Sequence, residues 1–158
     1  NNVNRNQYFS KYFNNYLLFL SVVSIGITIF IHLFCEYLIA REYFESIKYI
    51  SLQLLSVMFF ALGAFLNLVY ECSFTVKRSM YSAILATLVS LGLNIILIPY
   101  WGLLGSIISN IIAGLSMFIF RFVDVKRFVN IKLSKIGLLS ILLIVINILC
   151  SVYIDFFN

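Results

Sequence analysis

Five apolar stretches, each long enough to cross a lipid bilayer as a helix, constrain this chain more than any other feature of its sequence. They cover approximately residues 16–39, 49–70, 80–98, 102–123 and 136–154. A helix satisfies its own backbone hydrogen bonds, and about 20 residues suffice to cross the hydrocarbon. Only 11% of the 158 residues are charged and 63% are hydrophobic, which leaves too few charges to coat a soluble protein. We therefore expect one all-α, polytopic membrane domain over residues 1–158.

Pro99 separates two of these stretches and predicts a tight hairpin. Proline has no N–H and restrains the preceding residue toward extended geometry, so we expect Pro99 to end the helix before it. Tyr100 and Trp101 then lie where amphipathic rings meet the lipid headgroups. Because the next apolar stretch starts at Gly102, the second helix must turn straight back across the bilayer.

Small and polar residues recur every three or four positions in the apolar stretches, which places them on one face of each helix. In the first stretch they are Ser21, Ser24, Thr28, His32 and Glu36. In the third they are Ser82, Ala86, Ser90 and Asn94. The fourth has two adjoining rows, Gly102, Ser106, Asn110 and Gly114 beside Gly105, Ser109 and Ala113. Since small residues allow close helix packing in lipid, we expect the fourth helix at the centre of a bundle with an internal polar pathway.

The distribution of cations predicts the orientation of the chain. Alternating the loops between the two membrane faces puts nine of the eleven Lys and Arg residues on one side. By the positive-inside rule this side, which includes the N-terminus, is cytoplasmic, and the Pro99 turn is external. The cations form no basic run, so they do not indicate nucleic-acid binding. The chain starts with Asn, shows no signal peptide and has an odd number of spans, so we expect a fragment of a longer protein.

The sequence contains no constellation typical of an enzyme. No carboxylate pair occurs at helical spacing inside a span, and HExxH, GxSxG and glycine-rich phosphate loops are absent. Cys35, Cys72 and Cys150 are widely separated in apolar surroundings, so we interpret them as packing residues. We therefore expect no catalysis, no metal and no cofactor.

Three groups of residues are candidates for a functional role. His32 and Glu36 lie one helical turn apart in the first span, where ionisable groups could couple transport to ion flow. The alternative is that Glu36 lies at the interface and His32 bonds a neighbouring helix. The other candidates belong to the hairpin and its cytoplasmic end.

In the hairpin, Asn94 and Asn110 can face each other and bind a polar ligand, or they can simply join the two helices. Lys77, Arg78 and Arg121 lie at the predicted cytoplasmic membrane edge, where they could bind the phosphates of an anionic lipid. Alternatively, these three cations only fix topology and anchor to headgroups.

The hairpin sequence NIILIPYWGLLGS, residues 94–106, resembles a motif of polysaccharide flippases. These are O-antigen and capsular repeat-unit exporters of the multidrug/oligosaccharidyl-lipid/polysaccharide superfamily. The motif has an asparagine, an aliphatic run, Ile-Pro, an aromatic residue and Gly-x-x-Gly, which corresponds here to Asn94, Pro99, Trp101, Gly102 and Gly105. The chain differs from it at three positions, Ser90, Tyr100 and Ser106, where the family often has asparagine, a basic residue and alanine.

This resemblance implies a two-lobed transporter in the bacterial inner membrane, of which the chain is most of the C-terminal lobe and a separate N-terminal lobe is missing. The implied substrate is an undecaprenyl-diphosphate-linked oligosaccharide, which meets hydroxyl and amide groups at Ser90, Asn94 and Asn110 and cations such as Lys77 or Arg78. Membrane lipids and the polysaccharide polymerase machinery are the other expected partners. Two alternatives remain open, a multidrug exporter of the same superfamily and a membrane polysaccharide polymerase.

Overall fold

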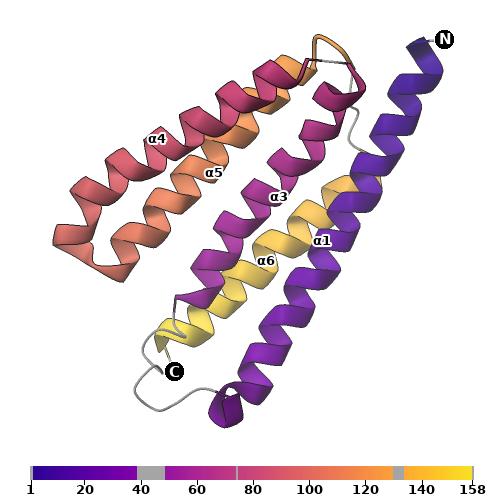
Figure 1. Ribbon diagram of the computed structural model, residues 1–158. Helices are drawn as coiled ribbons and strands as arrows, with labels where there is room; N and C mark the ends of the chain where they lie inside the picture. The colour runs from indigo at the N-terminus through magenta and orange to yellow at the C-terminus, as the bar shows by residue number, and fades with distance from the viewer. Residues whose placement is uncertain (1, 39–48, 74, 130–133, 158) are drawn as a thin grey trace.

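The chain folds into long helices that lie side by side (Figure 1). The computed structural model describes residues 2–38, 49–73, 75–129 and 134–157, and only the backbone at residues 2–5, 32, 35–38 and 154–157. Its helices are α1 (Asn2–Leu38), α3 (Ile50–Cys72), α4 (Val76–Trp101), α5 (Leu103–Val125) and α6 (Lys135–Phe157). Each contains a segment long and apolar enough to cross a membrane. The predicted all-α fold with five spans is confirmed, and the protein is a multi-pass membrane protein.

Helix α1 begins well before the predicted first span. The first apolar stretch starts near residue 16, but residues 2–15 are helical as well. Phe13 and Leu17, one turn apart, are almost completely buried against Leu66 and Tyr70 of α3. Burial of these large apolar side chains stabilises the amino-terminal turns despite their many asparagines.

Pro99 does not end its helix, contrary to the prediction. Helix α4 continues through Pro99 to Trp101 and ends at Gly102, whose φ is 54°. Pro99 has no N–H to donate to the carbonyl four positions earlier, but only Tyr100 and Trp101 follow it in the helix, so any bend it causes affects the last turn alone. The Gly102 N–H donates to the Ile98 carbonyl at 2.8 Å, and Gly102 adopts the positive φ that other residues avoid. The turn of the hairpin is therefore this single glycine.

Helix α5 packs along both α4 and α3, but the prediction that it is the central helix is wrong (Figure 1). Helix α3 lies between the α4–α5 hairpin and the pair α1 and α6, and it contacts all four of these helices. Gly105 lies against the α4 backbone, where an added Cβ would come within 2.5 Å of the Leu97 carbonyl oxygen. On the α3 side, a Cβ at Gly114 would lie 3.1 Å from the Phe59 Cβ. The two small rows of the sequence thus allow close contact with two different neighbours.

Helices α1 and α6 form a second pair. Ser24 and Thr28 of α1 both donate to the side-chain oxygen of Asn147 in α6, each at 3.2 Å. At the start of α6, the Asn14 side chain accepts a hydrogen bond from the Ser134 N–H at 3.0 Å. The polar residues Ser24 and Thr28 thus form hydrogen bonds to the neighbouring helix α6. An internal polar pathway shared by the helices stays a prediction.

The aromatic core lies toward one end of the bundle. Its buried members are Phe13, Leu17, Leu66, Val69, Tyr70, Val125 and Val129. The rings of Phe13 and Tyr16 lie 5.5 and 4.9 Å from that of Phe65, and these contacts join α1 to α3. The core therefore holds together the end at which α3 and α5 finish and α4 begins.

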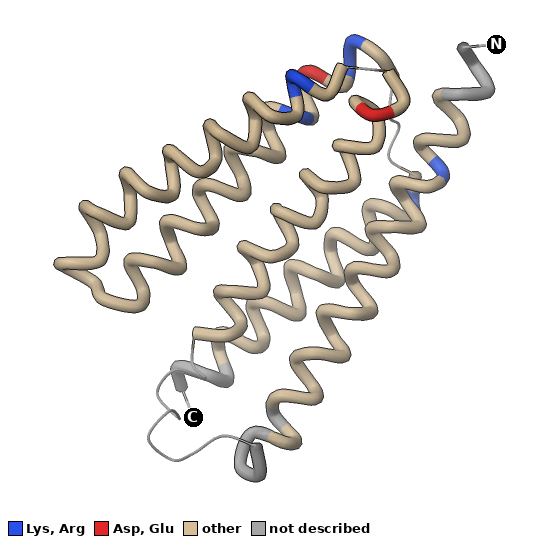
Figure 2. The backbone as a smooth tube through the Cα atoms, in the orientation of Figure 1, with Lys and Arg blue, Asp and Glu red and all other residues tan. Residues whose placement is uncertain are grey.

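Figure 2 shows the described cations gathered at this same end, which we call the basic end. Helices α3 and α5 end here and α4 and α6 begin here, so it carries the cations Lys77, Arg78, Lys126, Arg127 and Lys135 and the carboxylates Glu71 and Asp124. The clustering agrees with the predicted grouping of the loops, while its assignment to the cytoplasmic side stays a prediction. Arg41, Lys48 and the acidic loop between them lie outside the described residues.

Candidate functional site

A hydrogen-bonded polar cluster lies inside the α4–α5 hairpin. The Ser90 hydroxyl donates to Asn110 Oδ1 at 3.1 Å, and Asn94 Nδ2 donates to the Ser90 hydroxyl at 3.3 Å. Ser90 therefore bridges the two asparagines. Asn94 Oδ1 is buried and accepts no hydrogen bond, an arrangement that is unfavourable in apolar surroundings.

A groove of about 310 Å³ opens beside this cluster. Its lining comes from three helices and consists of Phe60, Ala83, Ala86, Thr87, Ser90, Leu91 and Met117. Ser90 belongs to both the groove and the cluster, so a ligand in the groove would reach the bridging hydroxyl. The aromatic ring, small side chains and hydroxyls of this lining suit a ligand with both apolar faces and hydroxyl groups.

Arg121 is buried between α3, α4 and α5, with only 6% of its surface exposed. Its Nε donates to the Ser82 hydroxyl and its Nη1 to the Gly63 carbonyl, both at 2.7 Å. Its Nη2 lies 3.4 Å from both the carbonyl and the hydroxyl oxygen of Ser79. This guanidinium joins helices, and its contacts do not direct it toward lipid phosphates at the membrane edge.

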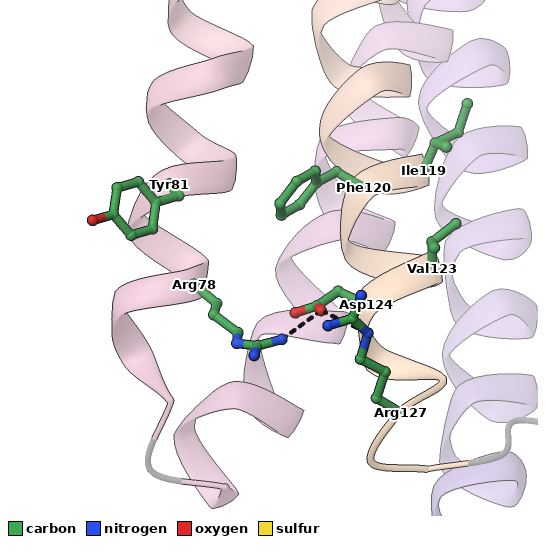
Figure 3. A pocket seen from close by; sticks show the side chains of 7 residues that line it. All are labelled: Arg78, Tyr81, Ile119, Phe120, Val123, Asp124 and Arg127. Carbon is green, nitrogen blue, oxygen red and sulfur yellow. Dashed lines mark hydrogen bonds and ion pairs between the residues drawn. The ribbon is translucent and has the colours of Figure 1, made fainter.

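A second, larger groove of about 510 Å³ lies between α4 and α5 at the basic end (Figure 3). Arg78, Asp124 and Arg127 gather at one end of it, and Tyr81, Phe120, Ile119 and Val123 lie farther along. We call it the basic groove. It combines charged groups with an apolar wall that is open to the outside of the bundle.

Two arginines in the basic groove share one carboxylate. Arg78 Nη1 donates to Asp124 Oδ1 at 2.6 Å, and Arg127 Nε lies 3.6 Å from the same oxygen. The Asp124 side chain is only 12% exposed, compared with 43% for Arg78 and 69% for Arg127. The guanidinium of Arg78 also lies 5.7 Å from the centre of the Phe128 ring, which helps to fix its position.

The structure separates the residues that the sequence proposes as one site. Ser90, Asn94 and Asn110 are together, whereas Lys77 and Arg78 lie at the basic end and Arg121 is inside the bundle. Lys77 is exposed. Pro99, Gly102 and Gly105 shape the hairpin turn. The side chains of His32 and Glu36 lie outside the described residues, so the coupling hypothesis stays a prediction.

Asp124 and Arg127 were not among the candidate residues of the sequence. Their spacing of three positions on one helix face was the available signal. It was not sufficient, because the sequence does not show that Arg78 of α4 reaches the same carboxylate. Among the side chains described, no group of three His, Cys, Asp or Glu residues is placed to bind a metal.

Comparison with known proteins does not assign this site. The chain matches no family model, no curated protein and no solved structure.

Proposed function

We propose that this chain is part of a flippase that moves lipid-diphosphate-linked oligosaccharides across the bacterial cytoplasmic membrane, for the synthesis of O-antigen or capsular polysaccharide. The resemblance of residues 94–106 to the flippase hairpin suggests this function, and the residues of the polar cluster belong to that hairpin or contact it.

The observation that carries the proposal is the position of Ser90, which links the Asn94–Asn110 cluster to the groove beside it. Amides and hydroxyls can both donate to and accept from sugar hydroxyls. Asn94 Oδ1 has no partner, so a hydroxyl group that reached it during opening of the hairpin would satisfy a buried acceptor. These groups therefore match the uncharged, hydroxyl-rich sugar part of the substrate, not its diphosphate.

A polar route is what such a substrate requires. Each unsatisfied polar group of a sugar-diphosphate costs several kcal/mol in hydrocarbon, so the headgroup cannot cross unaided. Amides and hydroxyls along the pathway replace its hydration while the lipid tail stays in the bilayer. Movement of the hairpin relative to α3 would then alternate access to the two sides.

The groove beside Ser90 is less suited to an organic cation, which is the usual substrate of a multidrug exporter. Of the carboxylates described, Glu71 and Asp124 both lie in the last helical turn at the basic end. Ser90 lies 12 positions after Arg78, about 18 Å along α4, and is therefore remote from these charges. We also propose transport rather than catalysis, because the cluster of Ser90, Asn94 and Asn110 contains no ionisable side chain.

Substitution of Asn110 tests the proposal. In the native host, Asn110→Ala in the full-length protein should lower surface polysaccharide about tenfold, because the substrate loses a hydrogen bond of the cluster. Lipid-linked oligosaccharide should accumulate in the cytoplasmic leaflet. Loss of a polymerase would instead leave single repeat units at the cell surface, so analysis of the surface glycan separates the two functions.

Asn147→Ala is the matched control, because Asn147 also accepts hydrogen bonds between two helices but does so between α1 and α6. Export normalised to the amount of membrane protein should change little in this variant. Equal normalised losses in both variants would mean that Asn110 only joins helices, and the proposed substrate contact would be wrong.

A further inference from the structure

We infer that the basic groove binds an anionic phospholipid of the surrounding bilayer. Arg78 and Arg127 hold its phosphate, and one acyl chain lies along Tyr81, Phe120, Ile119 and Val123. This inference does not depend on the proposed transport function. The basic groove is on the outer side of the hairpin, and its arginine Arg78 lies about 18 Å along α4 from Ser90.

The charges of the basic groove favour an anion. Two guanidinium groups face one carboxylate, so the local net charge is +1. The Arg127 side chain is 69% exposed, and its contact with Asp124 involves Nε alone, at 3.6 Å. Most of its five N–H groups are therefore available to a ligand. A planar guanidinium donates two parallel hydrogen bonds to phosphate oxygens, and Asp124 keeps the neighbouring Arg78 in place for the same headgroup.

The wall of the basic groove favours a lipid over a soluble phosphate. Tyr81 is 62% exposed, Val123 59%, Ile119 50% and Phe120 40%, on helices that cross the membrane. In the bilayer these side chains face acyl chains. A bound chain would cover them while its phosphate reached the arginines at the headgroup level, and the volume of about 510 Å³ accommodates a headgroup and the first part of a chain.

The choice between lipid classes follows from the same net charge. A zwitterionic lipid such as phosphatidylcholine brings a quaternary ammonium next to the phosphate and close to two arginines, which reduces the electrostatic gain. Phosphatidylglycerol presents a phosphate with no compensating cation. The basic groove should therefore select phosphatidylglycerol over phosphatidylcholine.

Native mass spectrometry of the purified full-length protein in detergent tests this inference. Titration with phosphatidylglycerol should give a bound lipid whose affinity falls about fivefold in Arg127→Gln, since one cation at the headgroup is lost. Lys126→Gln is the matched control, because it removes the same charge from the adjacent residue. The Lys126 ammonium lies 4.7 Å from the Phe122 ring and outside the basic groove, so this variant should bind as the wild type does.

Three results would overturn the inference. Equal binding by the Arg127→Gln and Lys126→Gln variants would show that the contact is unspecific. Equal binding of phosphatidylcholine and phosphatidylglycerol by the wild type would remove the charge argument, and this comparison needs no variant to fold. Displacement of phosphatidylglycerol by an equimolar amount of undecaprenyl phosphate would assign the basic groove to the transported lipid instead.

Discussion

Arg121 illustrates how a single side chain can organise the interior of this bundle. Its guanidinium donates to α3 through the Gly63 carbonyl and to α4 through Ser82, while its own backbone belongs to α5. Ser82 in turn donates to the Ser79 carbonyl at 2.7 Å, so the arginine ends a short chain of hydrogen bonds. A buried cation remains stable only when its donors are satisfied in this way.

We expect Arg121→Met to destabilise the bundle by about 2 kcal/mol, because methionine fills similar space but donates nothing to Gly63 or Ser82. Thermal unfolding in detergent, followed by circular dichroism, measures the effect. Lys126→Met removes an exposed cation five positions later and should leave the melting temperature unchanged. If both variants had the same melting temperature as the wild type, the guanidinium contacts would contribute nothing to stability.

The direction in which the Arg121 side chain points could not be predicted from the sequence. Its place near the end of an apolar stretch predicts a headgroup anchor, yet its side chain points inward because Gly63 and Ser82 offer acceptors at the same depth. The side chain of Arg127, six positions later, is the exposed one. The position of a cation along a helix gives its depth, but the neighbours that fix its direction belong to other helices. By contrast, Asn94 and Asn110 lie eight positions before and after the Gly102 turn, so the hairpin alone predicts that they come together. The sequence does not predict that the Ser90 hydroxyl bridges them.

At the scale of the helices, the hairpin depends on close backbone contact. Gly105 is the critical residue, since an added Cβ would lie 2.5 Å from the Leu97 carbonyl oxygen and 2.6 Å from its carbon. The obstacle is backbone, which cannot rotate away as the end of a flexible side chain can. Gly92 of α4 has no heavy atom within 4 Å of the corresponding position and so serves as a control.

Gly105→Ala should therefore destabilise the protein by about 1–3 kcal/mol, because α5 must move away from α4. Gly92→Ala should be neutral or stabilise the helix by up to about 1 kcal/mol, since alanine has the higher helix propensity. Thermal unfolding of both variants in the same detergent gives the comparison. Equal melting temperatures for the two variants would contradict the close contact at Gly105.

Hydropathy predicted the helices better than their ends. All five spans were recognisable because apolar side chains must fill the bilayer, whatever the neighbours are. The ends depended on local chemistry and tertiary contacts. Phe13 extends α1 toward the N-terminus by packing on α3, and the positive φ of Gly102, rather than Pro99, ends α4.

For the molecule as a whole, the basic end and the Gly102 turn should lie on opposite sides of the membrane. The described cations gather at one end, whereas Tyr100 is 81% exposed and Trp101 57% exposed beside the turn at the other. Aromatic rings of this kind are typical of the membrane–water interface, and an excess of cations is typical of the cytoplasmic side.

Cysteine labelling of intact cells tests this orientation. In a variant without the native cysteines, Tyr100→Cys should react with a membrane-impermeant maleimide added outside, because the distribution of cations predicts an external turn. Lys77→Cys should react only after the membrane is opened, because the same rule predicts a cytoplasmic basic end. Labelling of Lys77→Cys in intact cells, with no labelling of Tyr100→Cys, would reverse the orientation.

The single residue between α4 and α5 makes the hairpin sensitive to the thickness of the membrane. Helix α4 has 26 residues and α5 has 23, about 39 and 35 Å in length, and both exceed the roughly 30 Å of hydrocarbon. Helices that are too long for the bilayer tilt, and two helices joined by Gly102 alone must tilt together. Because Arg121 fixes their basic end to α3, a thinner bilayer would swing the opposite end of the hairpin sideways.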